Sequence, residues 1–270
     1  MARREAVAFT LGPLVVAAIV WLPPWVYLAV LGAAVVGAAD ELARMATTAG
    51  HAVFRPVAPL LVAATLTAAW ITGMSGLMVS VATIVLVVPV LQLMHPRSPD
   101  GSLNGAAVTA FTVLYLGVTG ACLGWLRLVP GDDLGWRLVL LFFGTIWLGD
   151  SGAYYVGRRF GRHKMSPRIS PNKTWEGLAG GTAATLAAAV ALGSLLRVDL
   201  PWPVLLGVAV ILAVAAPVGD LVESQFKRDT GVKDSSALLP GHGGLLDRTD
   251  SLLFAAPPVL ALLVATGTVG

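Results

Sequence analysis

Residues 204–219 read VLLGVAVILAVAAPVG, a run without a charged or hydrogen-bonding side chain that ends directly before Asp220. A helix across a bilayer core of about 30 Å needs about 20 apolar residues, and residues 204–222 reach that length. Eight further segments of this kind are spread along the chain. They are residues 6–22, 25–39, 56–71, 77–93, 106–129, 136–156, 178–196 and 251–269. The sequence therefore predicts an all-α polytopic membrane protein with about nine transmembrane helices and two long polar loops.

The composition supports this class. Of the 270 residues, 56% are hydrophobic and 12% are charged, whereas soluble domains carry about 25% charge. These values exclude an ordinary soluble globule and a disordered chain, and the single cysteine, Cys122, excludes an intramolecular disulfide. We treat residues 1–270 as one membrane domain, with less specific spans in 1–140 and the chemistry in 141–270. Whether Pro23-Pro24 separates two full spans is left open.

The positions of the positive charges predict the orientation in the membrane. If the N-terminus is cytoplasmic, only Arg127, Arg137 and Arg197 of the 18 Lys and Arg residues fall on the outer side, which agrees with the positive-inside rule. The two polar loops, residues 157–176 and 223–250, then face the cytoplasm from the cell (inner or plasma) membrane. The net charge of +3 gives no indication of a nucleic-acid partner, and we expect none.

Two apolar runs end in a Gly-Asp pair, at Asp150 and at Asp220. An unpaired ionisable residue at the bilayer centre costs about 2.5–3.5 kcal/mol on insertion scales and less near the interface. Each carboxylate could simply reach the headgroup region. Because both pairs open toward a basic cytoplasmic loop, however, we expect them to contribute to one polar site.

The second loop combines three features that favour a phosphate ligand. Lys227, Arg228 and Lys233 supply positive charge, and the glycine-rich turn 241–244 can bring backbone N–H groups close to an anion. Asp247 and Asp250 are three residues apart, on one face if the segment is helical, and a divalent cation bridging them to phosphate is the usual reason for such a pair. The alternative is a solvated loop with accidental spacing.

His242 lies in the glycine-rich turn, and no second His or Cys stands near it, so tetrahedral zinc coordination is disfavoured. In the first loop, Ser170-Pro171 predicts a helix N-terminus, with Ser170 as the cap and Pro171 in the first turn. Lys173 would then oppose the helix dipole, which favours an anion docked at that end. The alternative for Lys173 is a mere topology signal.

In these loops the chain resembles the phosphatidate cytidylyltransferases, or CDP-diacylglycerol synthases. The resemblance is sharpest between residues 147 and 251 and includes two shorter segments, residues 150–154 and 170–177. Its main motif matches at fixed spacing throughout the second loop. The matching residues are Ser224, Phe226, Lys227, Arg228, Lys233, Asp234, Ser236, Leu239, Pro240, His242, Gly243, Gly244, Asp247, Arg248 and Asp250.

The resemblance implies that CTP and phosphatidate are the substrates, within membrane lipid, and that CDP-diacylglycerol and pyrophosphate are the products. It implies Mg²⁺ as cofactor and leaves open a second cation such as K⁺ and a homodimer. The implied metal ligands are Asp220, Asp247 and Asp250, with Asp150 as a further candidate. The implied catalytic and phosphate-binding groups are Lys173, Lys227, Arg228, Lys233, Asp234 and Arg248. The implied substrate-positioning residues are Ser170, Asn172, Ser224, His242, Gly243 and Gly244.

Three other functions stay open from the residues alone. A related CTP-dependent enzyme could act on an isoprenoid or ether lipid, because nothing in the chain encodes the lipid tail. A secondary transporter could use the Gly-Asp breaks as discontinuous helices, although the polar residues gather on one side. A structural membrane scaffold would leave the loop cations and Asp247 and Asp250 without a purpose. Cytosine specificity and acyl preference cannot be read from the residues.

Overall fold

The computed structural model describes residues 15–94, 100–131, 133–236 and 243–269. Within these residues, seven helices are long and apolar enough to cross a membrane, which confirms the all-α polytopic class. They are α2 (Pro24–Thr48), α4 (Met74–Leu93), α5 (Ser102–Arg127), α6 (Leu134–Phe160), α7 (Trp175–Leu195), α8 (Trp202–Asp229) and α9 (Leu246–Ala265). A shorter apolar helix, α3 (Val57–Thr72), precedes α4.

The helix count stays partly a prediction. The 16 residues of α3 rise about 24 Å at 1.5 Å per residue, less than a bilayer core of about 30 Å. The first predicted span begins outside the described residues, and its described part, residues 15–21, is helical. The helix of residues 15–21 ends before Pro23. Pro24 occupies the first turn of α2, where the missing backbone N–H of a proline costs nothing. The two prolines therefore separate two helices.

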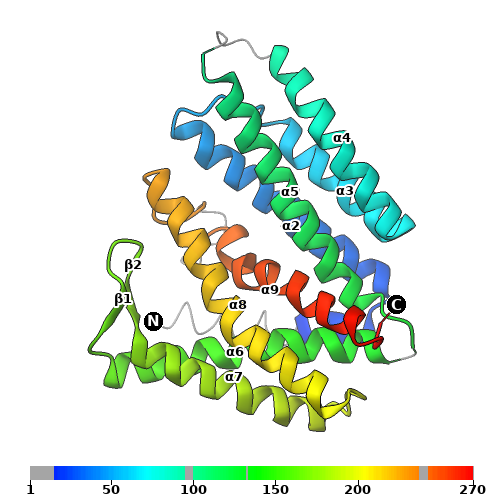
Figure 1. Cartoon of the computed structure of the whole chain (residues 1–270), viewed down its shortest axis with the longest axis vertical. Helices are drawn as coiled ribbons and strands as arrows, with labels where there is room; N and C mark the ends of the chain where they lie inside the picture. The colour runs from blue at the N-terminus through cyan, green and yellow to red at the C-terminus, as the bar shows by residue number, and fades with distance from the viewer. Residues whose placement is uncertain (1–14, 95–99, 132, 237–242, 270) are drawn as a thin grey trace.

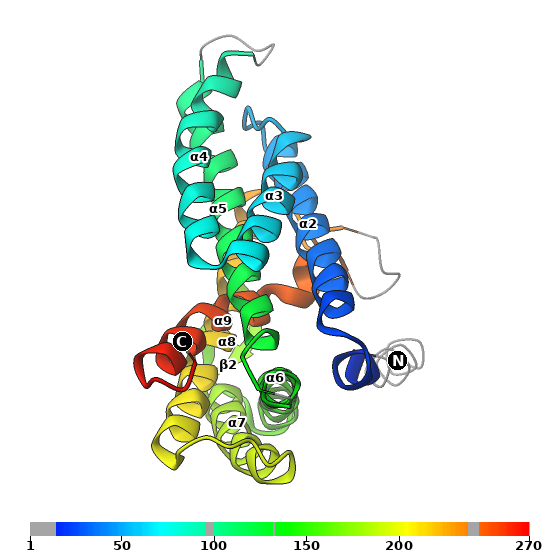
Figure 2. The ribbon, with the colours of Figure 1, turned by 90° about the vertical axis from the view of Figure 1, so that its right-hand side faces the viewer.

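Figures 1 and 2 show three groups of helices. The first contains α2, α3, α4 and α5, and the second is the antiparallel pair α6 and α7, seen nearly end-on in Figure 2. Helices α8 and α9 pack against each other and connect the two groups, with α9 against α5 and α8 against α7. The pair α6 and α7 approaches closely because Gly181 lacks a side chain: a Cβ there would lie 2.9 Å from Ala153 Cβ.

The first polar loop is not a loop, which corrects the sequence-based prediction. Helix α6 continues to Phe160, and an antiparallel hairpin of β1 (Lys164–Ser166) and β2 (Ser170–Thr174) follows it. Thr174, not Ser170, caps α7, because its hydroxyl accepts the Gly177 N–H at 3.1 Å. Lys173 therefore lies in β2, before the helix begins, and the dipole argument no longer applies to it.

The second polar loop is shorter than its predicted span of 223–250. Helix α8 continues to Asp229, so Glu223, Lys227 and Arg228 lie on its last turns, and α9 begins at Leu246. Figure 1 shows the hairpin and the end of α8 on one side of the molecule and the C-terminus on the other. This arrangement brings the hairpin and the α8–α9 connection, which carry most of the candidate residues, to the same end of the bundle.

Candidate active site

Three carboxylates meet where α8 and α9 pack together. One oxygen from each of Asp220, Glu223 and Asp250 lies within 4.8 Å of the others. Gly219 allows this approach, since a Cβ there would lie 2.6 Å from Phe254 Cβ and 3.0 Å from the Asp250 carbonyl oxygen. The glycine of the Gly-Asp pair thus has a packing role: it lets the α9 backbone come close to α8 beside Asp220.

Glu223 is the most deeply buried member of this carboxylate cluster, with 1% of its surface exposed. Its Oε1 has no hydrogen-bond or ion-pair partner within the described part of the chain. Its Oε2 lies 2.5 Å from Lys227 Nζ. Three like charges at this separation repel one another strongly outside bulk water, so the cluster requires nearby positive charge.

Two lysines supply part of that charge from different elements. Lys173 of β2 places its Nζ 2.8 Å from Asp220 Oδ2, so the hairpin reaches over the cluster. Lys227 of α8 contacts both Glu223 and, at 2.6 Å, Asp247 Oδ1. Asp150 of α6 interacts electrostatically with Asp220 and Lys173, which adds a fourth carboxylate to the same region.

Asp247 lies beside the cluster rather than within it. Its Oδ2 accepts hydrogen bonds from Ser235 N (2.9 Å) and Gly244 N (2.8 Å) and lies 2.8 Å from Ser235 Oγ, while Oδ1 contacts Lys227. Both Asp247 and Asp250 are on α9, one turn apart, but they face different partners. Among the described residues, the cluster contains Glu223 where the sequence analysis expected Asp247.

Several other candidate residues lie around this centre. Ser224 Oγ donates to Asp220 Oδ1 at 3.3 Å, and Arg228 Nε donates to the Ile169 carbonyl at 3.1 Å, which ties α8 to the hairpin. Gly243 has φ +76°, and a Cβ there would lie 2.5 Å from Asp247 Oδ2. Six of the described candidates have exposed side chains: Asp150, Asn172, Arg228, Lys233, Asp234 and Arg248. Ser170 is half-buried in β2, and His242 lies outside the described residues.

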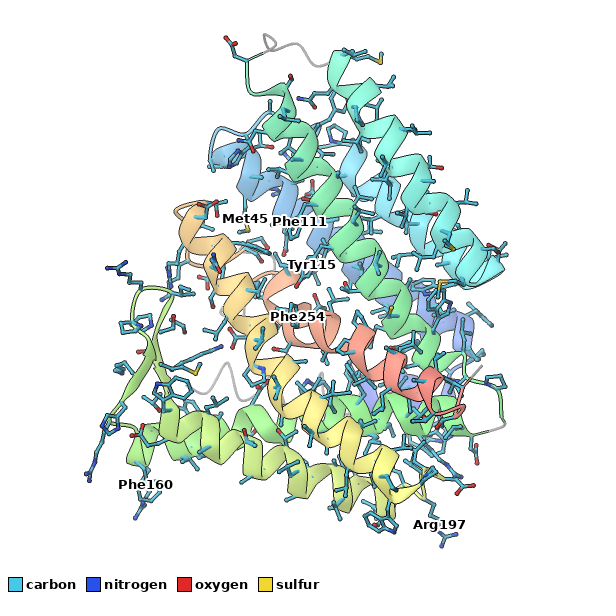
Figure 3. All side chains as sticks on the ribbon, in the orientation of Figure 1. Met45, Phe111, Tyr115, Phe160, Arg197 and Phe254 are labelled. Atoms are coloured by element: carbon cyan, nitrogen blue, oxygen red, sulfur yellow. The ribbon has the colours of Figure 1, made fainter. Side chains whose placement is uncertain are left out.

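An aromatic group flanks the cluster on the side of α5, and the sequence analysis missed it. Tyr115 stacks on Phe111 with ring centroids 5.4 Å apart, and Phe226 of α8 meets both rings edge-on. Figure 3 shows Phe111 and Tyr115 on α5 above Phe254 of α9. Tyr115 interacts electrostatically with Glu223 and Asp250, and within the described structure its buried hydroxyl has no hydrogen-bond partner.

Comparison with known proteins assigns the family. Residues 2–266 match the model of the cytidylyltransferase family. This chain belongs to the cytidylyltransferase family. It is 34% identical to a phosphatidate cytidylyltransferase of Mycobacterium bovis, over 96% of this chain and 86% of that protein. It is 42% identical to one of Staphylococcus aureus, over 60% of this chain and 61% of that protein. As a cytidylyltransferase, the protein is a membrane-embedded nucleotidyltransferase.

The donor set of this cytidylyltransferase fits a divalent metal ion. All three members of the cluster offer hard carboxylate oxygens, which are the ligands that Mg²⁺ prefers. Burying the Glu223 carboxylate with one oxygen unpartnered in the described structure is costly unless a cation compensates it. Glu223 was missed because the sequence analysis ended the eighth span at residue 222. Continued by one turn, that helix would have placed Glu223 beside Asp220.

Proposed function

We propose that this protein is a phosphatidate cytidylyltransferase, which transfers the cytidylyl group of CTP to phosphatidate and forms CDP-diacylglycerol and pyrophosphate. The observation that carries the proposal is the carboxylate cluster of Asp220, Glu223 and Asp250, flanked by Lys173 and Lys227, at one end of α8 and α9. The relatives of that name, matched over 96% of this chain in the mycobacterial case, support the choice of lipid.

The chemistry requires no nucleophile from the protein. A phosphate oxygen of phosphatidate attacks the α-phosphorus of CTP, a new P–O bond forms, and the bond between the α-phosphorus and the bridging oxygen breaks as pyrophosphate leaves. The protein must bring two polyanions together and hold them in line. Fixed positive charge in a site with little water stabilises the charge that spreads over the phosphoryl oxygens.

Our assignment gives the carboxylates to the metal and the cations to the phosphates. Asp220, Glu223 and Asp250 would hold Mg²⁺, with Asp150 nearby, and the ion would offset phosphate charge and polarise the reacting group. Lys173 binds substrate phosphate after leaving Asp220, and Lys227, anchored by Glu223 and Asp247, stays in place. We assign further phosphate contacts to Arg228, Lys233 and Arg248, and nucleotide contacts to Ser170, Asn172 and the turn with His242, Gly243 and Gly244.

Asp247 and Ser224 act through their neighbours in this proposal. Asp247 orients Lys227 and the backbone of residues 235 and 244, and Ser224 orients Asp220. Asp234 follows Lys233 on the exposed part of the α8–α9 connection, where it is available to a second cation. The proposed site faces the cytoplasm, where CTP is found.

The experiment is a substrate matrix with protein purified in detergent. Each of the four nucleoside triphosphates is combined with Mg²⁺ and either phosphatidate, a polyisoprenyl phosphate, an ether-linked phosphatidate analogue or no lipid. Pyrophosphate and the lipid product are measured. We expect pyrophosphate and the lipid product with CTP and phosphatidate and, more slowly, with CTP and the ether analogue. We expect neither product in the other combinations. Pyrophosphate release that needs polyisoprenyl phosphate, or no release with any lipid, would overturn the proposal.

A further inference from the structure

Glu41 is a buried acid of the N-terminal half of the chain that the proposed reaction leaves without a role. It lies on α2, two turns before the helix ends at Thr48, and only 4% of its surface is exposed. Its neighbour Asp40 is partly exposed and pairs with Arg44 and Arg55. The two adjacent carboxylates therefore have different environments, and only Glu41 faces the interior.

Both oxygens of Glu41 bind the segment that connects α8 to α9. Oε1 accepts hydrogen bonds from Ser236 Oγ (2.6 Å) and Leu245 N (3.0 Å), and Oε2 accepts them from Ser235 Oγ (2.8 Å) and Leu246 N (2.8 Å). The donors come from two parts of the chain, residues 235–236 and residues 245–246. One carboxylate on α2 thus joins residues 235–236 to residues 245–246.

The residues around these hydrogen bonds are tightly packed. A Cβ on Gly244 would overlap Ser235 Oγ and both carboxylate oxygens of Glu41, so only glycine fits there. One turn earlier on α2, Gly37 leaves the space that the Leu245 side chain occupies. Leu246, whose N–H reaches Glu41, is itself 1% exposed. The contact is therefore an enclosed hydrogen-bonded joint in which a carboxylate satisfies two backbone N–H groups.

A short path connects Glu41 to the carboxylate cluster. The Ser235 hydroxyl lies within hydrogen-bond distance of both Glu41 Oε2 and Asp247 Oδ2, at 2.8 Å from each. Asp247 contacts Lys227, and Lys227 contacts Glu223 of the cluster. Moving residues 235 and 244–246 would therefore move the groups that hold Asp247 and, through it, Lys227.

We propose that Glu41 is a positioning residue for cytidylyl transfer: its carboxylate clamps residues 235–236 to residues 245–246 and so keeps Asp247 and Lys227 aligned beside the metal-binding carboxylates. This inference rests on the proposed function. It also gives the N-terminal helices a part in the reaction, because Glu41 belongs to α2 and the metal-binding carboxylates belong to α8 and α9. Glu41 itself touches no substrate.

Glu41→Gln tests the clamp with almost no change in volume. Each oxygen of Glu41 accepts one backbone N–H, and a backbone N–H cannot reverse its direction. Either orientation of the glutamine amide therefore places its NH₂ group against the N–H of Leu245 or Leu246. We expect turnover per folded molecule to fall at least on the order of tenfold, with a higher Mg²⁺ concentration needed for half-maximal activity. Asp40→Asn, the matched control one residue away, should change turnover less than about twofold.

Ser235→Ala separates positioning from a purely structural role. It removes the hydroxyl shared by Glu41 and Asp247, so it should lower turnover and raise the Mg²⁺ requirement, as Glu41→Gln does. The double variant should be no worse than the more severe single variant, because both act along one path. Unchanged turnover and Mg²⁺ dependence in folded Glu41→Gln protein, or an equal loss in Asp40→Asn, would overturn the proposal.

A second measurement, the rate of proteolysis, does not depend on enzymatic activity and therefore tests the clamp independently of the proposed function. Lys233 is exposed in the α8–α9 connection, and trypsin cleavage after it reports how firmly the connection is held. We expect Glu41→Gln to accelerate this cleavage several-fold and Asp40→Asn to leave it unchanged. If the wild-type protein transfers no nucleotide to any lipid, the proposed function fails, and this rate alone decides the clamp: equal cleavage rates in the two variants would refute it.

Discussion

At the scale of single residues, the carboxylate cluster is the feature on which the chemistry depends. Asp220→Asn, Glu223→Gln and Asp250→Asn should each lower turnover by about a hundredfold or more, which corresponds to about 2.7 kcal/mol of transition-state stabilisation. Each change removes one ligand of a metal site while keeping the side-chain shape. Steady-state turnover against Mg²⁺ concentration is the measurement, and excess Mg²⁺ should restore part of the activity.

Two comparisons make this prediction specific. Asp229→Asn, at the exposed end of the same helix, should retain full turnover. The double variant Asp220→Asn with Asp250→Asn should be little worse than either single variant, because one site fails as a unit. Multiplicative losses in the double variant would show that the acids do not share one metal. A full loss in Asp229→Asn would show that the effect is not specific to the carboxylate cluster.

Lys173 provides the second residue-scale prediction. Its ion pair with Asp220 places its charge where substrate phosphate is expected, and a charge-assisted contact contributes about 1.5–3 kcal/mol. Lys173→Met should therefore lower turnover on the order of tenfold to a hundredfold, with normal expression. Lys164→Met changes an exposed lysine of the same hairpin and should have little effect on turnover in the same assay. Equal losses in the two variants would show that Lys173 contributes only general positive charge and not a specific phosphate contact.

The sequence could name Asp220 because it ends an apolar run, Asp250 because of its spacing from Asp247, and Lys227 because of the positive charge in the second loop. It named Lys173 too, but on a helix-dipole argument that does not hold for a residue in β2. It could not name Glu41. Nothing in its local sequence distinguishes it from Asp40, and its partners lie about 200 positions later in the chain. The separation of Asp247 from the cluster also depended on the backbone of residues 235 and 244, which local spacing does not reveal.

At the scale of elements, the close contact of α8 and α9 is what assembles the cluster. Gly219→Ala should push the helices apart, since its Cβ would lie 2.6 Å from Phe254 Cβ and 3.0 Å from the Asp250 carbonyl oxygen. Overpacking of this kind costs about 1–3 kcal/mol. We expect a lower melting temperature in detergent together with a turnover reduced at least tenfold.

A second glycine of the same helix pair is the control. Gly207→Ala would place a Cβ 2.8 Å from Leu262 Cδ2, the far end of a flexible side chain. That side chain can rotate away, so thermal unfolding and turnover should stay close to wild type. Full activity in Gly219→Ala would show that the position of α9 against Asp220 does not matter for catalysis.

The apolar cores of the helices could be predicted from hydropathy, and their ends could not. The last turns of α6 and α8 carry polar residues beyond the predicted ends at 156 and 222, because backbone hydrogen bonds can extend a helix beyond its apolar run. The β-hairpin has no alternation of apolar and polar residues. It depends on pairing of Lys164 with Thr174 and of Ser166 with Ser170, which the sequence alone did not indicate.

At the scale of the whole molecule, the orientation in the membrane remains a prediction from the distribution of Lys and Arg. Asp199→Cys and Asp229→Cys each place a thiol on an exposed residue, one shortly before α8 and one at its end, in a chain whose native Cys122 is buried. In intact cells, an impermeant maleimide should label the Asp199→Cys variant and leave the Asp229→Cys variant unlabelled until the membrane is opened. The opposite pattern would place the carboxylate cluster outside the cell.

The central claim is that the cluster at the end of α8 and α9 directs attack of a lipid phosphate on the α-phosphorus of CTP. The most direct measurement uses CTP labelled at either the α- or the γ-phosphorus, with phosphatidate and Mg²⁺, for the wild-type protein and Asp250→Asn. The account predicts that α-label enters the lipid, that γ-label leaves as pyrophosphate in equal amount, and that Asp250→Asn lowers both by about a hundredfold or more. γ-Label in the lipid, or undiminished transfer by Asp250→Asn, would contradict it.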